Sequence, residues 1–241
     1  MLDMAHTSQN KPTIPFSFSN YAEGFDDHIG KSIRGYAELR NDCVLLSEYF
    51  IENDTNVLDI GCSTGRFLRG IRDYNLDKSP DARYLGVDIE PEFRKQWEAI
   101  SDSHIKYQLG DLRSFDGYEN LSFVTSLFSL QFIPEKDRCS VMQNIYTNLI
   151  PGGAFVMAEK TLGKSAKIQD MLTFMYYDHK RHSFSEQEIL EKEKSLRNKL
   201  KLWTEPQIIA TLEKVGFHPD NIQVFWRNHL FAGFLAIKQA I

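Results

Sequence analysis

An apolar strand that runs directly into a turn of small residues constrains this chain more than any other feature. Residues 56–68 read NVLDIGCSTGRFL, which predicts a strand, a tight turn and an amphipathic helix. Small residues in such a turn let backbone N–H groups approach a ligand closely. A second predicted strand, 83–88, ends on Asp88, and an acidic residue there binds ribose hydroxyls in α/β nucleotide sites. The two segments together indicate a nucleoside cofactor above the first two strands.

The glycine spacing indicates which nucleoside is bound. The dinucleotide fingerprint is G-x-G-x-x-G, whereas Asp59, Gly61, Ser63 and Gly65 form the pattern D-x-G-x-S-x-G. This pattern resembles motif I of the class I S-adenosylmethionine (SAM) methyltransferases, whose loop receives the amino-acid end of SAM. The resemblance implies SAM as the cofactor and S-adenosylhomocysteine (SAH) as its product. The alternative for this segment alone is a purely structural strand-to-helix turn.

Strands and helices alternate along the chain as far as residue 160. Helices are expected over 20–50 with a break near Gly35, over 65–73, from Pro91 to about 101, and over 135–149. Strands are expected over 56–60, 83–88, 105–109, 121–128 and 154–158, the last after the turn at 151–153. This alternation predicts a parallel sheet with right-handed crossovers.

The pattern changes after residue 160. Residues 164–200 predict two helices and no strand, and a helix over 205–215 ends at Gly216. The last two strands, 221–227 and 230–238, are joined only by Asn228 and His229, which requires an antiparallel hairpin. The expected fold is therefore a Rossmann-like α/β class I methyltransferase fold, a mostly parallel seven-stranded sheet with an antiparallel last strand. We expect a flexible tail over 1–18, one domain over 19–241, and a helical lid over about 164–200 that covers the carboxyl ends of the strands.

Composition excludes several classes of protein. The net charge of −5 argues against a broad nucleic-acid surface, which requires excess positive charge. The three scattered cysteines favour reduced thiols in the cytoplasm. We find no apolar run long enough for a membrane span, no signal-peptide core in the first residues, and no His/Cys cluster with metal-ligand spacing. The expected partner is a small-molecule substrate.

Further cofactor contacts are expected at the ends of strands three and four. Asp111 follows strand three, where in this fold it reaches the adenine amino group while Leu112 packs on the ring; a turn-capping role is the alternative. Phe128 and Phe132 end strand four and are either core residues or cofactor contacts. Cys62 is expected to be a small buried residue rather than a nucleophile.

Candidate catalytic residues are found near the end of strand five and in the first lid helix. Glu159 is expected at the mouth of the pocket as a general base, or as a solvated carboxylate. His179 and His182 are candidate bases near neutral pH, with Tyr177 beside them, although basic residues at a helix end also complement the helix dipole.

Several segments together resemble the carboxy-S-adenosylmethionine synthase family, which supplies the carboxymethyl donor for wobble-uridine modification in bacterial tRNA. The segments are 22–27, 32–36, 59–63, 129–132, 148–154, 159–160, 177–181 and 185–189. The family's enzyme is a homodimer that acts on SAM and prephenate, so the resemblance implies a homodimer through N-terminal or lid helices. It places the family's cofactor contacts at Tyr36, Gly61, Cys62, Ser63, Asp88, Ile89, Asp111 and Leu112.

Two positions depart from that family. Its carboxylate-binding arginine aligns with Glu193, and its strand-four asparagine aligns with Leu127. A glutamate repels a carboxylate, and an apolar side chain provides no hydrogen bond. The leading hypothesis is therefore a SAM-dependent methyltransferase acting on a small or medium-sized acceptor. The alternatives are a synthase that uses Arg34, Lys194 or Arg197 as its cation, and a SAM-binding subunit without catalysis.

Overall fold

The computed structural model describes residues 23–240, so the tail expected over residues 1–18 lies outside the described part. The helices are α1 (Phe25–Ser32), α2 (Tyr36–Ser47), α3 (Arg66–Asn75), η2 (Pro91–Phe93), α4 (Arg94–Ile100), η3 (Leu130–Phe132), α5 (Glu135–Asn148), α6 (Ala166–Lys180), α7 (Glu186–Leu196), α8 (Glu205–Val215) and η4 (Pro219–Asn221). The strands are β1 (Asn56–Ile60), β2 (Arg83–Asp88), β3 (Ile105–Leu109), β4 (Leu121–Leu127), β5 (Leu149–Leu162), β6 (Trp203–Thr204), β7 (Ile222–Asn228) and β8 (Phe231–Ile237).

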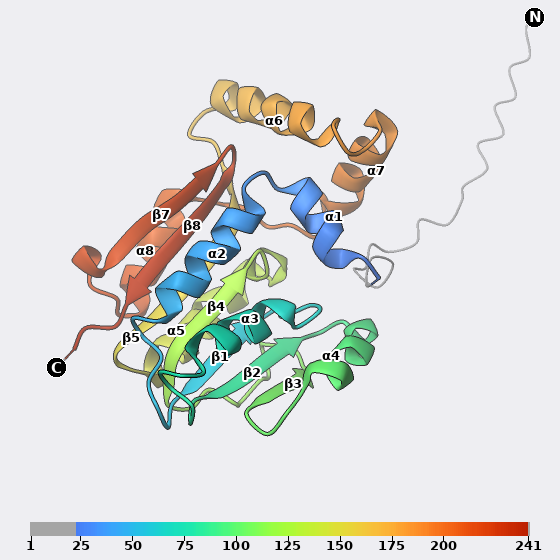
Figure 1. Ribbon diagram of the computed structural model, residues 1–241. Coiled ribbons are helices and arrows are strands. Elements are labelled where there is room, and N and C mark those ends of the chain that lie inside the picture. Colours follow the sequence, from blue (N-terminus) through green and yellow to red (C-terminus); the bar gives the residue numbers. More distant parts are fainter. Residues whose placement is uncertain (1–22, 241) are drawn as a thin grey trace, which may run out of the picture.

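The strands form a sheet of order β3-β2-β1-β4-β5-β8-β7, to which β6 adds by pairing with β5 (Figure 1). β1 pairs in parallel with β2 on one side and with β4 on the other. β8 is antiparallel to both β5 and β7. The predicted Rossmann-like class I methyltransferase fold with an antiparallel last strand is thus confirmed. Because the strand order reverses at β1 and β4, their carboxyl ends open onto the crevice where such sheets bind ligands.

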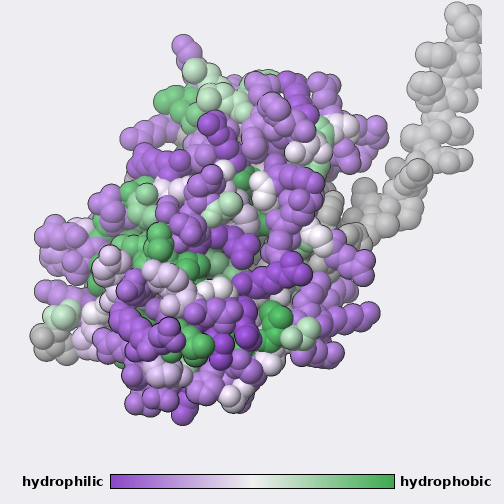
Figure 2. All heavy atoms as spheres, viewed as in Figure 1, coloured by the Kyte–Doolittle hydropathy of each residue, from purple (hydrophilic) through white to green (hydrophobic). Residues whose placement is uncertain are grey.

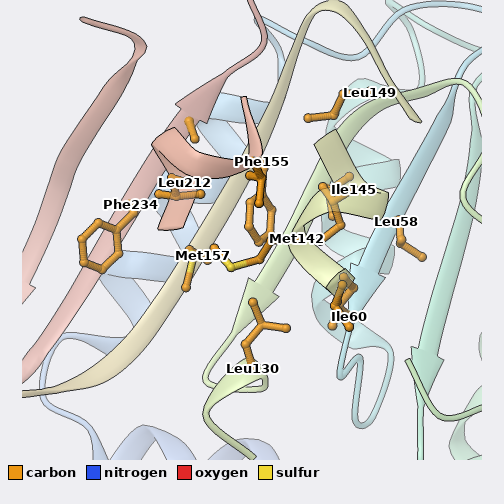
Figure 3. Packing of buried hydrophobic residues seen from close by; sticks show 14 of the residues in the cluster. Leu58, Ile60, Leu130, Met142, Ile145, Leu149, Phe155, Met157, Leu212 and Phe234 are labelled. Carbon is orange, nitrogen blue, oxygen red and sulfur yellow. The ribbon is translucent and has the colours of Figure 1, made fainter. Parts of the chain in front are cut away.

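Helices cover both faces of the sheet. On one face, Met142 and Ile145 of α5 and Leu212 of α8 pack on Ile60 and Phe155 of the central strands (Figure 3). On the other face, α2 and α3 pack against β1, β4 and β5 in a second cluster of buried residues. Each large apolar side chain removed from water in this way contributes roughly 1.5–3 kcal/mol. The central strands are therefore held rigidly, and so are the loops that follow them.

Two strand boundaries differ from the predictions because of local backbone conformation. β4 ends at Leu127 rather than at 128, because Phe128 has a φ of 60° and leaves the extended conformation. β5 begins at Leu149, and the predicted turn at 151–153 lies inside it as an irregularity with Gly152 at a φ of 83°. The two-residue strand β6 was not predicted, because it is too short for any periodicity.

The remaining elements agree closely with the sequence. Gly35, at a φ of 76°, separates α1 from α2. The segment expected to form a lid contains α6 and α7, and α7 begins with a capping box in which Ser185 and Glu188 bind each other's backbone N–H groups. The final hairpin turns at His229 and Leu230, one residue later than predicted. None of the helices in residues 23–240 is long and apolar enough to cross a membrane.

Candidate functional site

A cavity of about 640 Å³ opens at the carboxyl ends of the parallel strands. Its walls come from α1, from the segments after β1, β2, β3 and β4, and from the lid helices α6 and α7. This volume lies within the range of small-molecule sites, roughly 300–1,000 Å³. The cavity therefore lies where the fold predicts a ligand, with the lid helices forming its outer wall.

The turn after β1 lines the cavity through Gly61, Cys62 and Ser63. Gly61 has a φ of 72°, and a Cβ atom there would lie 2.0 Å from Oγ of Ser129. Only glycine fits such a position without a shift of its neighbours. Cys62 is buried and burial raises the pKa of its thiol, which agrees with a small packing residue rather than a nucleophile.

Asp88 at the end of β2 holds this turn in place. Its Oδ2 accepts a hydrogen bond of 2.8 Å from the backbone N–H of Ser63, and its Oδ1 accepts one of 2.9 Å from Glu90. Burial raises the pKa of Asp88, and the N–H bonds oppose that shift. Asp88, the acidic residue expected to bind ribose, thus lines the cavity, and two backbone N–H groups hold its carboxylate in place.

Asp59, at the base of the cavity, is buried within the sheet. Its Oδ1 accepts a hydrogen bond of 2.7 Å from the hydroxyl of Thr125 on β4. Burial raises the pKa of Asp59 to about 7, because a charged carboxylate loses its hydration there. Asp59 therefore joins β1 to β4 directly below the turn.

The expected adenine end of the site is also assembled. Ile89, Asp111 and Leu112 all line the cavity. The guanidinium of Arg113 binds Asp111, with Nε 3.0 Å from each carboxylate oxygen, and this bond lowers the pKa of Asp111. The carboxylate that is expected to reach the adenine is therefore paired with Arg113 through both of its oxygens.

Tyr36 and Phe128 also line the cavity, whereas Gly65 does not. A Cβ atom on Gly65 would lie 2.5 Å from Tyr107, whose hydroxyl donates a 2.8 Å hydrogen bond to the Gly65 carbonyl. Gly65 has a φ of 77° and is the N-cap residue before α3, so its role in the structure is to let the chain turn tightly beneath Tyr107.

The sequence analysis expected Glu159 at the mouth of the cavity, and this expectation is wrong, because Glu159 does not line the cavity. It is 4% exposed, and its two oxygens accept hydrogen bonds of 3.1 and 3.0 Å from the backbone N–H groups of Leu130 and Gln131. Burial raises the pKa of Glu159 to about 8, against the charge of Arg138. Successive residues of a strand point to opposite faces, so it is Lys160 that lines the cavity.

The other three candidate bases also lie outside the cavity lining. His179, His182 and Tyr177 are absent from its walls, whereas Tyr176 and Lys180 of the same helix form part of them. Residues four apart share one helix face, so the face of α6 that meets the cavity carries Tyr176 and Lys180. The histidine rings instead contact each other, with ring centroids 6.5 Å apart.

The sequence analysis missed the positively charged wall of the cavity, to which Lys160, Lys180 and Lys192 contribute. Glu193, beside them on α7, pairs with Lys160 at a distance of 3.2 Å. Burial lowers the pKa of Lys180, while the charge of Glu193 opposes that shift. Burial, together with the charge of Lys180, lowers the pKa of Lys192 to about 7. The spacing of apolar residues in the two lid helices does not predict which helix face meets the cavity, so the position of these lysines could not be predicted from the sequence.

Gln131 positions the cavity ends of β4 and β5 relative to each other. Its Nε2 donates to the carbonyl of Phe128 at 3.1 Å, and its Oε1 accepts from the backbone N–H of Lys160 at 3.0 Å. Because Glu159 holds the backbone of Gln131, this buried network fixes where Phe128 and Lys160 enter the cavity.

Comparisons with known proteins agree with this arrangement. A model of the methyltransferase domain family matches residues 57–153. The chain is similar to the carboxy-S-adenosyl-L-methionine synthase of Staphylococcus epidermidis, with 33% identity over 92% of this chain and 96% of that protein.

Two solved structures share the fold. An O-methyltransferase family protein from Burkholderia thailandensis has a TM-score of 0.62 and 14% identity, over 94% of this chain and 64% of that one. Phosphoethanolamine N-methyltransferase 2 of Haemonchus contortus, in complex with SAM, has a TM-score of 0.58 and 17% identity, over 93% of this chain and 60% of that one. Both likenesses show the fold, and the match to the methyltransferase domain family supports SAM as the cofactor, as the sequence predicted.

Proposed function

The chain belongs to the carboxy-S-adenosyl-L-methionine synthase family of the class I methyltransferase superfamily, and we propose that it is a SAM-dependent methyltransferase acting on a small or medium-sized acceptor. The observation that carries this proposal is the lining of the cavity by Leu127 and Glu193. These are the positions where the resemblance places the family's asparagine and carboxylate-binding arginine. Neither residue donates a hydrogen bond to a carboxylate, so this part of the wall suits an uncarboxylated sulfonium.

The lining residues fit SAM as a cofactor. We assign its amino-acid end to Gly61, Cys62 and Ser63, where the absence of a side chain at Gly61 leaves backbone groups accessible. We assign the ribose to Asp88. The adenine is assigned to the pocket formed by Ile89, Asp111 and Leu112, and Tyr36 and Phe128 close the site toward the lid.

When bound, SAM supplies a methyl group on a positively charged sulfur. A lone pair of the acceptor forms the new bond to the methyl carbon while the sulfur keeps the electrons of the bond that breaks, which leaves SAH. The protein has to orient the acceptor and exclude water. An acceptor that is already nucleophilic needs no general base, in line with the position of Glu159, His179 and His182 outside the cavity lining.

A second candidate function, carboxy-SAM synthesis, is favoured by one observation. Lys160, Lys180 and Lys192 line the cavity and provide positive charge where the family's arginine is replaced by Glu193. Arg34, Lys194 and Arg197, the substitute cations suggested by the sequence, are not among the lining residues.

Product analysis separates these functions. The purified protein is incubated with SAM and a small-molecule cell extract, and separately with SAM and prephenate, and the products are identified by mass. Methyl transfer yields SAH and a product 14 mass units heavier than its acceptor, the mass of one added CH₂. A carboxylated SAM from prephenate would favour the synthase, and binding of SAM without turnover in either mixture would favour a non-catalytic subunit.

We further propose that the protein is a homodimer that uses the lid. Ile168, Met171, Phe174 and Met175 are exposed along one side of α6, between 43% and 62% of their surface. Hydrophobic residues gather over this helix at the top of the molecule (Figure 2). Exposed apolar patches of this kind mark protein interaction surfaces. Light scattering should give the mass of a dimer for the wild type and of a monomer for Phe174→Glu; a monomeric wild type would refute the proposal.

A further inference from the structure

The carboxylate of Asp26 on α1 connects three segments around the cofactor side of the cavity. The hydroxyl of Thr64, in the turn after β1, donates to it, with Oγ1 3.0 and 3.2 Å from its two oxygens. The guanidinium groups of Arg40 on α2 and Arg66 on α3 lie 3.9 and 3.6 Å from it. The side chain of Arg66 is 71% exposed, against 26% for Arg40, so water and salt weaken the contact with Arg66 most.

Asp26, Thr64 and Arg40 are not among the residues that line the cavity, but each lies next to one that does. Ser63 precedes Thr64 and belongs to the turn assigned to the amino-acid end of SAM. The guanidinium of Arg40 lies 5.8 Å from the ring centroid of Tyr36, which also lines the cavity. Any effect of Asp26 on a bound cofactor is therefore indirect.

The turn that contains Thr64 has an unfavourable backbone conformation. Ser63 has a φ of 45°, in the left-handed region that residues other than glycine rarely adopt. Such a conformation persists only where surrounding contacts hold it. The N–H of Ser63 donates to Asp88, and its carbonyl accepts a 2.7 Å hydrogen bond from the indole N–H of Trp97. The hydroxyl of Thr64 adds a third contact, to Asp26.

α1 forms the wall of the cavity between the lid and the turn after β1 (Figure 1). Phe25 at its start packs against Phe93 of η2, with ring centroids 5.4 Å apart. His28 contacts Phe184, between α6 and α7, at 5.2 Å. A hydrogen bond to a carboxylate is stronger and more directional than such ring contacts, so Asp26 fixes the position of α1 relative to the turn.

We propose that Asp26 is a positioning residue for the cofactor, because its carboxylate holds both α1 and the strained turn at Ser63 and Thr64 in the conformation that receives SAM. A site that is formed before binding loses less conformational freedom when the ligand enters. SAM therefore binds more tightly than it would to a mobile turn. This inference rests on SAM as the cofactor and not on the acceptor, so it is the same for methyl transfer and for carboxy-SAM synthesis.

The test is calorimetric binding of SAH to the full-length protein and to two pairs of variants. Asp26→Ala leaves the buried hydroxyl of Thr64 without its acceptor and should weaken SAH binding at least tenfold. Asp27→Ala is the matched control, because it removes one negative charge from the same first turn of α1 and loses the exposed ion pair with Lys31. This control should bind SAH within twofold of the wild type.

The second pair of variants changes the other end of the contact. Thr64→Val replaces the hydroxyl with a methyl group of similar size and should weaken SAH binding at least fivefold. Thr64→Ser keeps the donor and should bind SAH as the wild type does. If Asp26→Ala does not fold, this pair decides the proposal, and equal affinities of Thr64→Val and Thr64→Ser overturn it.

A double-mutant cycle separates a positioning role from a general loss of stability. Asp26→Ala and Thr64→Val remove the two ends of one contact, so the double variant should bind SAH no more weakly than Asp26→Ala alone. Additive losses overturn the proposal, as do wild-type affinity in Asp26→Ala and equal losses in Asp26→Ala and Asp27→Ala.

Hydrogen exchange of the ligand-free protein tests the same contact without a cofactor. The amides of residues 61–65 and of α1 should exchange faster in Asp26→Ala than in Asp27→Ala. Equal exchange rates overturn the proposal. If the wild type binds neither SAM nor SAH, the proposed function fails, and the exchange rates still decide whether Asp26 holds the turn.

Discussion

The backbone N–H of Ser63 lies 2.8 Å from Oδ2 of Asp88 and donates a hydrogen bond to it. This single contact joins the turn after β1 to the acidic end of β2. The carbonyl of Val87 strengthens the junction, because it accepts hydrogen bonds from the N–H groups of Gly61 and Cys62 at 2.7 and 3.2 Å. The two motifs that indicated a nucleoside site are thus one structural unit, and a change in either should affect both.

Replacing Asp88 with alanine should weaken SAM binding at least tenfold, which corresponds to about 1.4 kcal/mol. The variant loses the assigned ribose contact and also leaves the N–H groups of Ser63 and Glu90 without their acceptor. Calorimetry with SAM and SAH measures the effect. Asp77→Ala, an exposed site outside the cavity lining, is the control, and equal affinities for the two variants would contradict the assignment.

Gly61→Ala should destabilise the protein more than Gly152→Ala. Both glycines have positive φ, 72° and 83°, so both variants incur backbone strain of about 1 kcal/mol. Only at Gly61 does the new Cβ meet another atom, Oγ of Ser129 at 2.0 Å, whereas nothing lies within 4 Å at Gly152. Overpacking adds roughly 1–3 kcal/mol, and urea denaturation of both variants should reveal that difference. Equal stabilities would show that the turn relaxes freely.

Asp59 should make the ligand-free protein less stable as the pH rises. Its pKa is raised by burial from 3.8 to about 7, so between these values the folded state holds a proton that the unfolded state has lost. The contribution of Asp59 is complete below pH 3.8 and disappears as the pH approaches 7, with a slope of up to about 1.4 kcal/mol per pH unit.

Asp59→Asn keeps an oxygen to accept the hydrogen bond from Thr125 and removes the titration. The free energy of unfolding, measured at several pH values, should therefore fall less steeply for the variant than for the wild type. Parallel profiles would mean that Asp59 titrates normally in the folded protein.

The histidines of the lid should be dispensable for chemistry. His179→Gln and His182→Gln are expected to form SAH within twofold of the wild-type rate, because neither residue lines the cavity. The same holds for Tyr177→Phe. Steady-state kinetics with the identified acceptor provide the measurement, and a hundredfold loss of kcat in either histidine variant, with SAM affinity intact, would restore it as a general base.

The sequence predicted the fold well because strands, turns and helices have local signals. The alternation of elements, Gly35 between two helices and Gly216 after another are all readable from neighbouring residues. The backbone conformation of Phe128 was not readable, since a bulky residue at positive φ is held there by its surroundings and not by its own preference.

Some cavity residues could likewise be predicted from the local sequence, and others could not. Gly61, Ser63 and Asp88 occur at fixed places in a known motif, and the structure brings them together. Glu159 and Lys160 are adjacent in a strand buried on both sides, so hydrophobic alternation gave no indication of which one faces the cavity. The sequence did not distinguish Lys180 from the other titratable residues of its helix, because the face that a lid helix turns toward the cavity depends on how it packs against distant segments.

The most direct test is mass spectrometry of the small molecule that stays bound when the protein is purified without added ligand. The proposed function predicts the mass of SAM or of SAH, released when the protein is denatured. A carboxylated SAM in its place, or no nucleoside together with no SAM binding by calorimetry, would contradict it.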